Sequence, residues 1–152
     1  MTRVLMVCLG NICRSPLAEG ILKSKVDRNT VFVDSAGTGA WHSGELPDKR
    51  SIAVAKKYGI DLTDQRARLF LVEDFDKFDH IYVMDQSNYK NVCRLAPNDE
   101  AINKVQLILN ESYPDENLEV PDPYYGGDQG FENVYKMLDE ACLKIKNKLE
   151  NA

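Results

Sequence analysis

The sequence predicts an α/β fold: one domain with a doubly wound, parallel, four-stranded sheet that carries helices on both faces. The first observation is a set of short apolar runs typical of strands buried on both faces, at residues 4–8, 31–33, 81–84 and 105–109. Stretches with helical signals separate these runs, which implies parallel strands joined by right-handed crossovers. The length of 152 residues is that of a single domain, so we expect residues 1–152 to form one. The expected strand order is 2-1-3-4, as in flavodoxin-like sheets.

Four helices are expected between and after these strands. The first should run from Ser15 to about residue 25, because Ser15 is a favoured cap, Pro16 suits the first helical position and Glu19 is an early acid. Its buried side should carry Leu17, Ile21 and Leu22. The others are expected at residues 47–58, 86–95 and 131–149, the second of them closed by Gly59. The last has apolar residues at helical spacing: Val134, Met137, Leu138, Ala141, Cys142, Ile145 and Leu149.

The composition excludes several classes of function. Nineteen Lys and Arg against 24 Asp and Glu give a net charge of −5, which disfavours nucleic acid or an anionic membrane as the main partner. No apolar run reaches the ~18 residues that a membrane span needs, and the N-terminus does not resemble a signal peptide. Two histidines without paired ligand spacing give no indication of a metal site. Four cysteines without a sign of secretion favour free thiols, so we expect a cytoplasmic protein. We also expect a monomer.

The turn after the first strand carries the chemistry. It reads Cys8-Leu9-Gly10-Asn11-Ile12-Cys13-Arg14-Ser15 and joins a buried strand to a helix N-terminus, where backbone N–H groups and the helix dipole favour an anion. Arg14 can bind two phosphate oxygens with its planar guanidinium. The same cation and helix terminus stabilise a thiolate, so we expect Cys8 to be a nucleophile that faces a bound phosphoryl group. A nucleotide P-loop would need a Lys followed by Ser or Thr, which this turn lacks.

This turn and three further segments resemble the low-molecular-weight protein tyrosine phosphatases. The further segments are Asp34-Ser35-Ala36-Gly37-Thr38, Met84-Asp85-Gln86-Ser87-Asn88 and Asp122-Pro123-Tyr124-Tyr125-Gly126, and they occur in family order over nearly the whole chain. The resemblance implies hydrolysis of phosphotyrosine esters through a cysteinyl-phosphate intermediate, without a metal or other cofactor. The substrates would be phosphotyrosine proteins or small aryl phosphates. Inorganic phosphate and other oxyanions would act as inhibitors.

A second group is needed because phenolate is a poor leaving group unless it is protonated. Asp122 is the candidate general acid, since Pro121 and Pro123 restrict the backbone on both sides and hold its carboxyl in an extended loop. The resemblance places the general acid of the family at this residue. Once it has lost its proton, the same carboxylate can activate the water that hydrolyses the cysteinyl-phosphate.

Neighbouring polar residues are candidates for support of the phosphate-binding turn. Ser15 either donates its hydroxyl to the Cys8 thiolate or caps the helix. Asn11 can adopt a left-handed backbone and bond to Ser35, which is the arrangement that the resemblance implies. Family members add a His to this network, whereas this chain has Gln65 at that position. How the network is completed here is therefore open.

Three loop aromatics would form a substrate mouth suited to a phenyl ring: Trp41, Tyr124 and Tyr125. We expect Asp85, at the end of the third strand, to support the tyrosine-bearing turn. Cys13 lies five residues from Cys8, so a reversible protective disulfide is conceivable if the turn distorts to bring the two Cα atoms within about 7 Å. The alternative is that Cys13 is only a packing residue.

Four other functions stay open from the sequence. An arsenate reductase of related fold also begins with a Cys-x5-Arg loop, but it needs further cysteines, and Cys93 is the only candidate in the middle of this chain. A protein-arginine phosphatase would carry Thr where this chain has Ile12. A phosphotyrosine-binding or thiol redox-sensing module would not be an enzyme, and an intact Cys8 and Asp122 argue against stable capture without hydrolysis.

Overall fold

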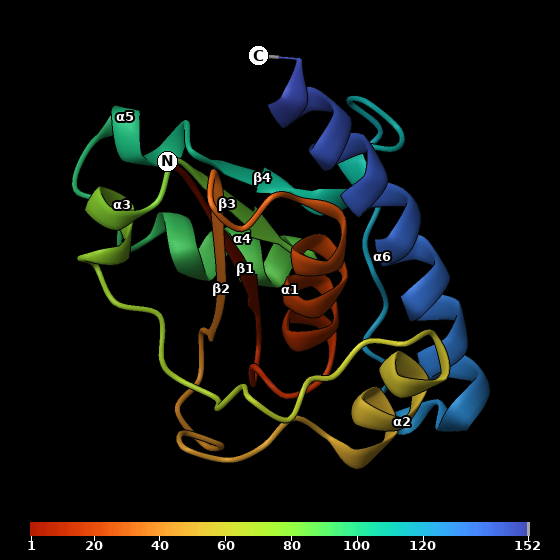
Figure 1. The fold of residues 1–152 in the computed structure, drawn as a ribbon. Helices are drawn as coiled ribbons and strands as arrows, with labels where there is room; N and C mark the ends of the chain where they lie inside the picture. The colour runs from red at the N-terminus through yellow and green to blue at the C-terminus, as the bar shows by residue number, and fades with distance from the viewer. Residues whose placement is uncertain (152) are drawn as a thin grey trace.

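A computed structural model describes residues 1–151, except for the side chain of Tyr125. Four parallel strands form one sheet in the order β2-β1-β3-β4, which confirms the predicted fold class and strand order (Figure 1). The strands are β1 (Thr2–Cys8), β2 (Val31–Gly37), β3 (His80–Val83) and β4 (Val105–Leu107). Because all four run in the same direction, the loops that follow Cys8, Gly37 and Val83 leave the sheet at one edge.

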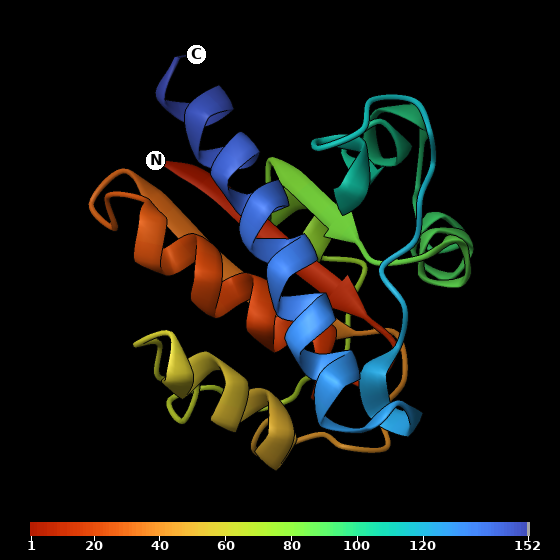
Figure 2. The same cartoon turned by 90° about the vertical axis from the view of Figure 1, so that its right-hand side faces the viewer.

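Helices cover both faces of this sheet, as Figure 2 shows. On one face α1 (Arg14–Lys25) packs beside α6 (Gly127–Glu150), and α2 (Lys49–Lys57) contacts both of these helices. The opposite face carries α4 (Gln86–Cys93), together with the one-turn helices α3 (Asp74–Lys77) and α5 (Asp99–Ile102). The sheet is therefore the middle of three layers, and its central strand β1 is shielded from water on both faces.

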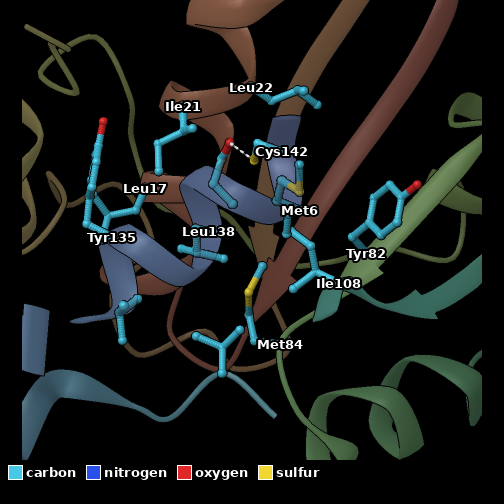
Figure 3. Close-up of a cluster of buried hydrophobic side chains, with 14 of the residues drawn as sticks. Met6, Leu17, Ile21, Leu22, Tyr82, Met84, Ile108, Tyr135, Leu138 and Cys142 are labelled. Atoms are coloured by element: carbon cyan, nitrogen blue, oxygen red, sulfur yellow. Dashed lines mark hydrogen bonds between the residues drawn. The ribbon is translucent and has the colours of Figure 1, made fainter. Parts of the chain in front are cut away.

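The side chains of β1 alternate between two apolar cores. Val4, Met6 and Cys8 belong to the larger core, which α1 and α6 complete. Figure 3 shows this core around Leu138 and Cys142, whose Sγ donates a hydrogen bond to the Ala18 carbonyl oxygen at 3.7 Å. The alternate residues Leu5 and Val7 face the smaller core, which Phe70, Phe75 and Phe78 fill. Burial on both faces explains why the apolar run of β1 is continuous.

The start of the first helix differs from the prediction. We expected Ser15 to cap it and Pro16 to occupy its first position, but α1 begins at Arg14 and Cys13 is the capping residue. The reason is that the Ser15 hydroxyl lies 3.0 Å from Cys8 Sγ, so it is not available to the backbone N–H groups of the helix. Pro16 still falls in the first turn, where its missing N–H costs nothing.

Other boundaries were wrong by a few residues. The second strand continues past residue 33 to Gly37, because its pairing with β1 runs as far as Cys8. The fourth strand ends at Leu107 instead of residue 109, and a 3-10 helix, η1 (Ile108–Asn110), follows it. The helices predicted at 47–58, 86–95 and 131–149 are the observed α2, α4 and α6. The short helices α3 and α5 were not predicted. Among the described residues, none of the helices has the length and apolar character that crossing a membrane requires.

Candidate active site

A cleft of about 230 Å³ opens at the edge of the sheet where β1 ends. Three separate parts of the chain line it: the turn after β1, the loop after β2, and the turn before α6. The lining residues are Cys8, Leu9, Gly10, Ile12, Cys13, Arg14, Trp41, His42, Asp122 and Tyr124. This is the edge at which a doubly wound sheet binds its ligand. The structure thus brings together the predicted nucleophile, phosphate clamp and general acid.

Cys8 lies at the floor of the cleft, at the last position of β1. Cys8 is only 2% exposed, so a substrate reaches it from the cleft alone. The Ser15 hydroxyl, 3.0 Å from the sulfur, is placed to donate to a thiolate. Of the two roles that we considered for Ser15, the contact with Cys8 is therefore the one the structure shows.

The Arg14 guanidinium is buried and held in place by two oxygen acceptors. Its Nη1 donates to Asp85 Oδ2 at 2.7 Å and to the Val120 carbonyl oxygen at 2.9 Å. Burial acts to lower the pKa of Arg14, but the neighbouring Cys8 and Asp85 outweigh it, and the net direction is upward. Arg14 therefore stays charged near neutral pH. A buried, oriented cation of this kind is suited to a phosphate dianion.

Asp85 contacts Arg14 and caps a helix. Its Oδ1 accepts a hydrogen bond from the Asn88 N–H at 2.8 Å, and Asp85 is the N-cap of α4. Its Oδ2 binds Arg14. That Asp85 also supports the tyrosine-bearing turn stays a prediction.

Asn11 organises the phosphate-binding turn from a left-handed backbone, with φ of 57°. Its Nδ2 donates to the hydroxyls of Ser15 at 2.8 Å and Ser35 at 2.9 Å, and its Oδ1 accepts from the Arg68 N–H at 3.0 Å. The predicted backbone conformation and the bond to Ser35 are both confirmed. Because the amide donates to Ser15, the hydroxyl proton of Ser15 is left to point at Cys8.

Glu19 completes this network, and Gln65 does not. Ser35 donates its hydroxyl to Glu19 Oε1 at 2.6 Å, and Lys23 pairs with the other carboxylate oxygen. The Gln65 amide turns away and donates to the Pro16 carbonyl oxygen at 3.1 Å. Burial raises the pKa of Glu19, while the hydrogen bonds from Lys23 and Ser35 partly oppose that rise. Glu19, which we expected only to mark the start of a helix, is thus the last acceptor in the hydrogen-bond network of Asn11 and Ser35.

Asp122 approaches the cleft from the turn before α6. It caps the 3-10 helix η2 (Pro123–Tyr125), and its Oδ1 accepts from the Tyr124 N–H at 3.0 Å. Its Oδ2 lies 3.9 Å from Arg14 Nη2, and the side chain is 40% exposed. A carboxyl in this position faces both the phosphate clamp and solvent, as a group that exchanges protons with water requires.

Two of the three predicted aromatics rim the cleft. Trp41 is 71% exposed and Tyr124 is 41% exposed. The Trp41 ring covers Gly39 so closely that a Cβ at Gly39 would come within 1.8 Å of the ring, which explains the glycine at that position. The side chain of Tyr125, our third candidate for the mouth, lies outside the described residues. His42, which we did not single out, also lines the cleft.

Cys13 shares the cleft with Cys8 but differs from it in environment. Burial, and to a lesser degree the nearby Asp48, raises the pKa of the Cys13 thiol to about 12. Cys13 is therefore a protonated thiol near neutral pH and cannot replace Cys8 as a nucleophile. Cys93 is partly buried outside the cleft, and Cys142 lies in the larger core.

Comparison with known proteins decides the family. A family model described as "Low molecular weight phosphotyrosine protein phosphatase" matches residues 3–152. The chain belongs to this family. It is similar to the phosphatase of Schizosaccharomyces pombe with that description, at 44% identity over 141 residues that cover 90% of this chain and 89% of the relative. The chain is accordingly a protein-tyrosine phosphatase.

Solved structures of other tyrosine phosphatases share its fold. A protein tyrosine phosphatase from Entamoeba histolytica, with Hepes in the active site, superposes with a TM-score of 0.92 at 36% identity, covering 99% of this chain and 98% of that one. Wzb from Vibrio vulnificus, in complex with benzylphosphonate, has a TM-score of 0.86 at 29% identity, with coverage of 97% and 98%. The whole phosphatase, including the loops around the cleft, is thus comparable with proteins of known structure.

Residues distant in sequence hold the site of this phosphatase together, and the sequence analysis did not identify them. Arg68 pairs with Asp34 and Asp74 while its backbone N–H binds Asn11, and Arg50 contacts the turn that carries Asp122. An arginine in a loop or on a short helix has no local signal that predicts such contacts. The nearest sequence signal is Asp48, two residues before Arg50, which is a residue type favoured at the start of a helix and here accepts from the Arg50 N–H.

We predict that Asn11→Ala destabilises the phosphatase by about 2–4 kcal/mol, because it removes three hydrogen bonds and strains the left-handed backbone. Asn11→Gly loses the same hydrogen bonds without the strain, so it should be about 1 kcal/mol more stable than the Ala variant. Urea unfolding of both variants measures the difference. Equal stabilities of the two variants would mean that the backbone conformation at this position costs nothing.

Proposed function

We propose that the chain hydrolyses phosphotyrosine and related aryl phosphate monoesters, with Cys8 as nucleophile, Arg14 as phosphate clamp and Asp122 as general acid and base. The observation that supports this most directly is that these three side chains line one cleft although Asp122 is distant in the sequence from Cys8 and Arg14. The remaining residues of the turn would contribute the backbone of the phosphate cradle: Leu9, Gly10, Asn11, Ile12, Cys13 and Ser15.

In the first half-reaction, the Cys8 thiolate attacks phosphorus and forms the S–P bond as the bond from phosphorus to the phenolic oxygen breaks. Asp122 gives its proton to the departing phenolate, which leaves as a neutral phenol. Arg14 is positioned to bind the equatorial phosphate oxygens, over which the charge of the phosphoryl group is spread in the transition state. The chain's own residues supply each charge and proton that this step requires.

In the second half-reaction, a water molecule attacks the phosphorus of the cysteinyl-phosphate. The Asp122 carboxylate accepts a proton from this water, the S–P bond breaks, and inorganic phosphate leaves. The Ser15 hydroxyl, 3.0 Å from the sulfur, stabilises the thiolate that departs. The end state has a protonated Asp122 and a free thiolate, which is the starting state of the first half-reaction.

An aryl substrate fits the walls of the cleft better than an alkyl phosphate. Trp41 and Tyr124 stand on its rim, and aromatic side chains of this kind pack well against a phenyl ring. The similar protein Wzb binds benzylphosphonate, in which a phenyl group and a phosphonate are joined by one carbon. The same geometry supports phosphotyrosine as substrate for this chain, and inorganic phosphate or another oxyanion as inhibitor.

The test is hydrolysis of phenyl phosphate and of a phosphotyrosine peptide in the presence of a chelator, compared with the same peptide carrying phosphoserine. We expect turnover of both aryl phosphates, little turnover of phosphoserine, and inhibition by inorganic phosphate. No turnover by fully reduced protein would overturn the proposed function. Preference for phosphoserine would overturn the assignment of the aromatic mouth.

We also propose that Cys13 protects Cys8 from oxidation. Both cysteines line one cleft, and the Cys13 thiol keeps its proton near neutral pH, so it stays reduced while the Cys8 thiolate is oxidised. Peroxide would convert the Cys8 thiolate to a sulfenic acid; the Cys13 sulfur would then bond to the Cys8 sulfur, and the sulfenic hydroxyl would leave as water with the Cys13 proton. After mild peroxide treatment, mass spectrometry should detect this disulfide and thiol reagents should restore activity. The Cys13→Ser variant should instead accumulate irreversibly oxidised Cys8, and equal recovery of both proteins would contradict protection.

We further propose that the chain acts as a single-domain, cytoplasmic monomer. The family match extends over residues 3–152, which supports a single domain. The four cysteines are free thiols, as a reducing compartment favours. Cys8, Arg14 and Asp122 line one cleft of a single chain, which supports activity as a monomer. Light scattering on the purified protein and fractionation of cells test the monomer and the compartment separately.

A further inference from the structure

Arg50, on α2, contacts the turn that carries Asp122. Its Nη1 donates to the Tyr124 carbonyl oxygen at 2.9 Å. Its guanidinium also lies over two aromatic rings, 5.2 Å from the centroid of Tyr124 and 4.5 Å from that of Phe131 in α6. One side chain thus binds the backbone of the turn and packs against the helix that follows it. Cation–π contacts of this kind strengthen as the cation is desolvated.

A second set of bonds connects Arg50 with the phosphate-binding turn. Asp48 accepts from Arg50 Nε with one carboxylate oxygen and from Arg50 Nη2 with the other, each at 3.1 Å. The backbone N–H of Asp48 in turn donates to the Ile12 carbonyl oxygen at 2.8 Å. A short series of contacts therefore joins Ile12 in the phosphate cradle to Tyr124 beside the general acid.

Asp122 lies midway between two fixed points of the backbone. Two residues before it, the Val120 N–H donates to the Met84 carbonyl oxygen at 2.8 Å, and the Val120 carbonyl oxygen accepts from Arg14. Two residues after it, Tyr124 is bound by Arg50. The upstream point belongs to the sheet and the phosphate clamp. The downstream point is bound to α2 through Arg50.

We propose that Arg50 is a positioning residue that sets the Asp122 carboxyl over the phosphate-binding turn by fixing the Tyr124 backbone relative to Ile12. This inference rests on the proposed role of Asp122 as general acid. Arg50 itself lines no part of the cleft and touches no reacting atom. Misplacement of a catalytic carboxyl by as little as 1 Å costs up to ~10²-fold in rate, so one structural link of this kind has a measurable effect.

The planar, forked shape of the guanidinium is what this role requires. Arg50 binds both oxygens of Asp48 and a carbonyl oxygen while its flat face packs on the two rings. A lysine ammonium carries the same charge but offers a single point of contact and no planar face. Arg50→Lys therefore separates the effect of geometry from the effect of charge.

The test is kcat/KM of Arg50→Ala and Arg50→Lys on two aryl phosphates with different leaving groups. 4-Nitrophenolate leaves readily without a proton, whereas phenolate needs the proton from Asp122. We expect both variants to lose about tenfold or more on phenyl phosphate and less than threefold on 4-nitrophenyl phosphate. Lys57→Ala is the matched control, because Lys57 lies on the same helix but pairs with Glu132 of α6 and not with the turn that carries Asp122. It should behave like wild type on both substrates.

The outcomes separate this inference from the proposed function. If Asp122→Ala depends on the leaving group but the Arg50 variants lose equally on both substrates, or lose nothing, Arg50 does not position the acid and the proposed function stands. If Asp122→Ala shows no dependence on the leaving group, the assignment of the acid itself fails. Full activity of Arg50→Lys would show that charge alone matters and would overturn the positioning role. Circular dichroism and melting temperature establish that each variant is folded before it is assayed.

Discussion

Replacement of Cys8 by serine should reduce turnover of phenyl phosphate by at least about 10⁴-fold, the scale of effect seen when a catalytic nucleophile is removed. A serine hydroxyl at the floor of the cleft stays protonated near neutral pH and is a far weaker nucleophile than a thiolate. Of its polar neighbours, Ser15 already accepts a hydrogen bond from Asn11, and Asp122 is needed as an acid. The variant should therefore be folded and inactive.

The same variant should still bind its substrate. Arg14 and the backbone of the turn do not depend on the sulfur, so titration calorimetry of Cys8→Ser with a phosphotyrosine peptide should give a measurable affinity that inorganic phosphate competes away. Cys93→Ser is the matched control: this thiol lies outside the cleft, and its loss should change turnover less than twofold. Substantial activity in Cys8→Ser would mean that another group is the nucleophile.

Replacement of Asp122 by alanine should lower kcat/KM on phenyl phosphate by about 10²–10⁴-fold, the usual contribution of a positioned general acid. The loss should be much smaller for 4-nitrophenyl phosphate, whose leaving group does not need the proton. Steady-state rates on both esters check the two expectations.

A nearby carboxylate provides the control for this experiment. Asp128 lies in the first turn of α6, six residues after Asp122, and does not line the cleft. Asp128→Ala should retain both the rate and the leaving-group dependence of wild type. If Asp128→Ala and Asp122→Ala lost activity to the same extent, the negative charge near Arg14 would matter more than a proton donated at one atom.

Much of the fold was predictable because its strands are buried on both faces. A continuous apolar run such as that of β1 is a strong signal, and right-handed crossovers leave few possible strand orders. The short helices α3 and α5 were not predictable, because a single turn contains too few residues to display a helical period. The start of α1 was mispredicted because a serine with a tertiary partner looks the same in sequence as a serine that caps a helix.

The chemical residues of the site were predictable from one turn, but their supports were not. Cys8, Arg14 and Ser15 occur together because a phosphate cradle at a helix N-terminus is a local structure. The contacts of Glu19, Arg50 and Arg68 join segments 16 to 74 residues apart, and no pattern within one element encodes them. Gln65 illustrates the same limit. The sequence shows that it stands where family members have a histidine, but not that Ser35 donates to Glu19 while Gln65 donates to the Pro16 carbonyl oxygen.

The burial of α1 has a consequence for how this enzyme loses its activity. The first nine residues of the helix, from Arg14 to Leu22, are all buried, since the sheet, α2 and α6 surround them. A helix enclosed in this way cannot fray from its N-terminal end without disrupting the core. Its amide protons should therefore exchange with solvent only when the whole domain unfolds. The phosphate-binding turn leads directly into this helix, so it should unfold together with it. Heat should therefore abolish catalysis and unfold the core in a single transition. We expect no intermediate that is folded but unable to bind phosphate.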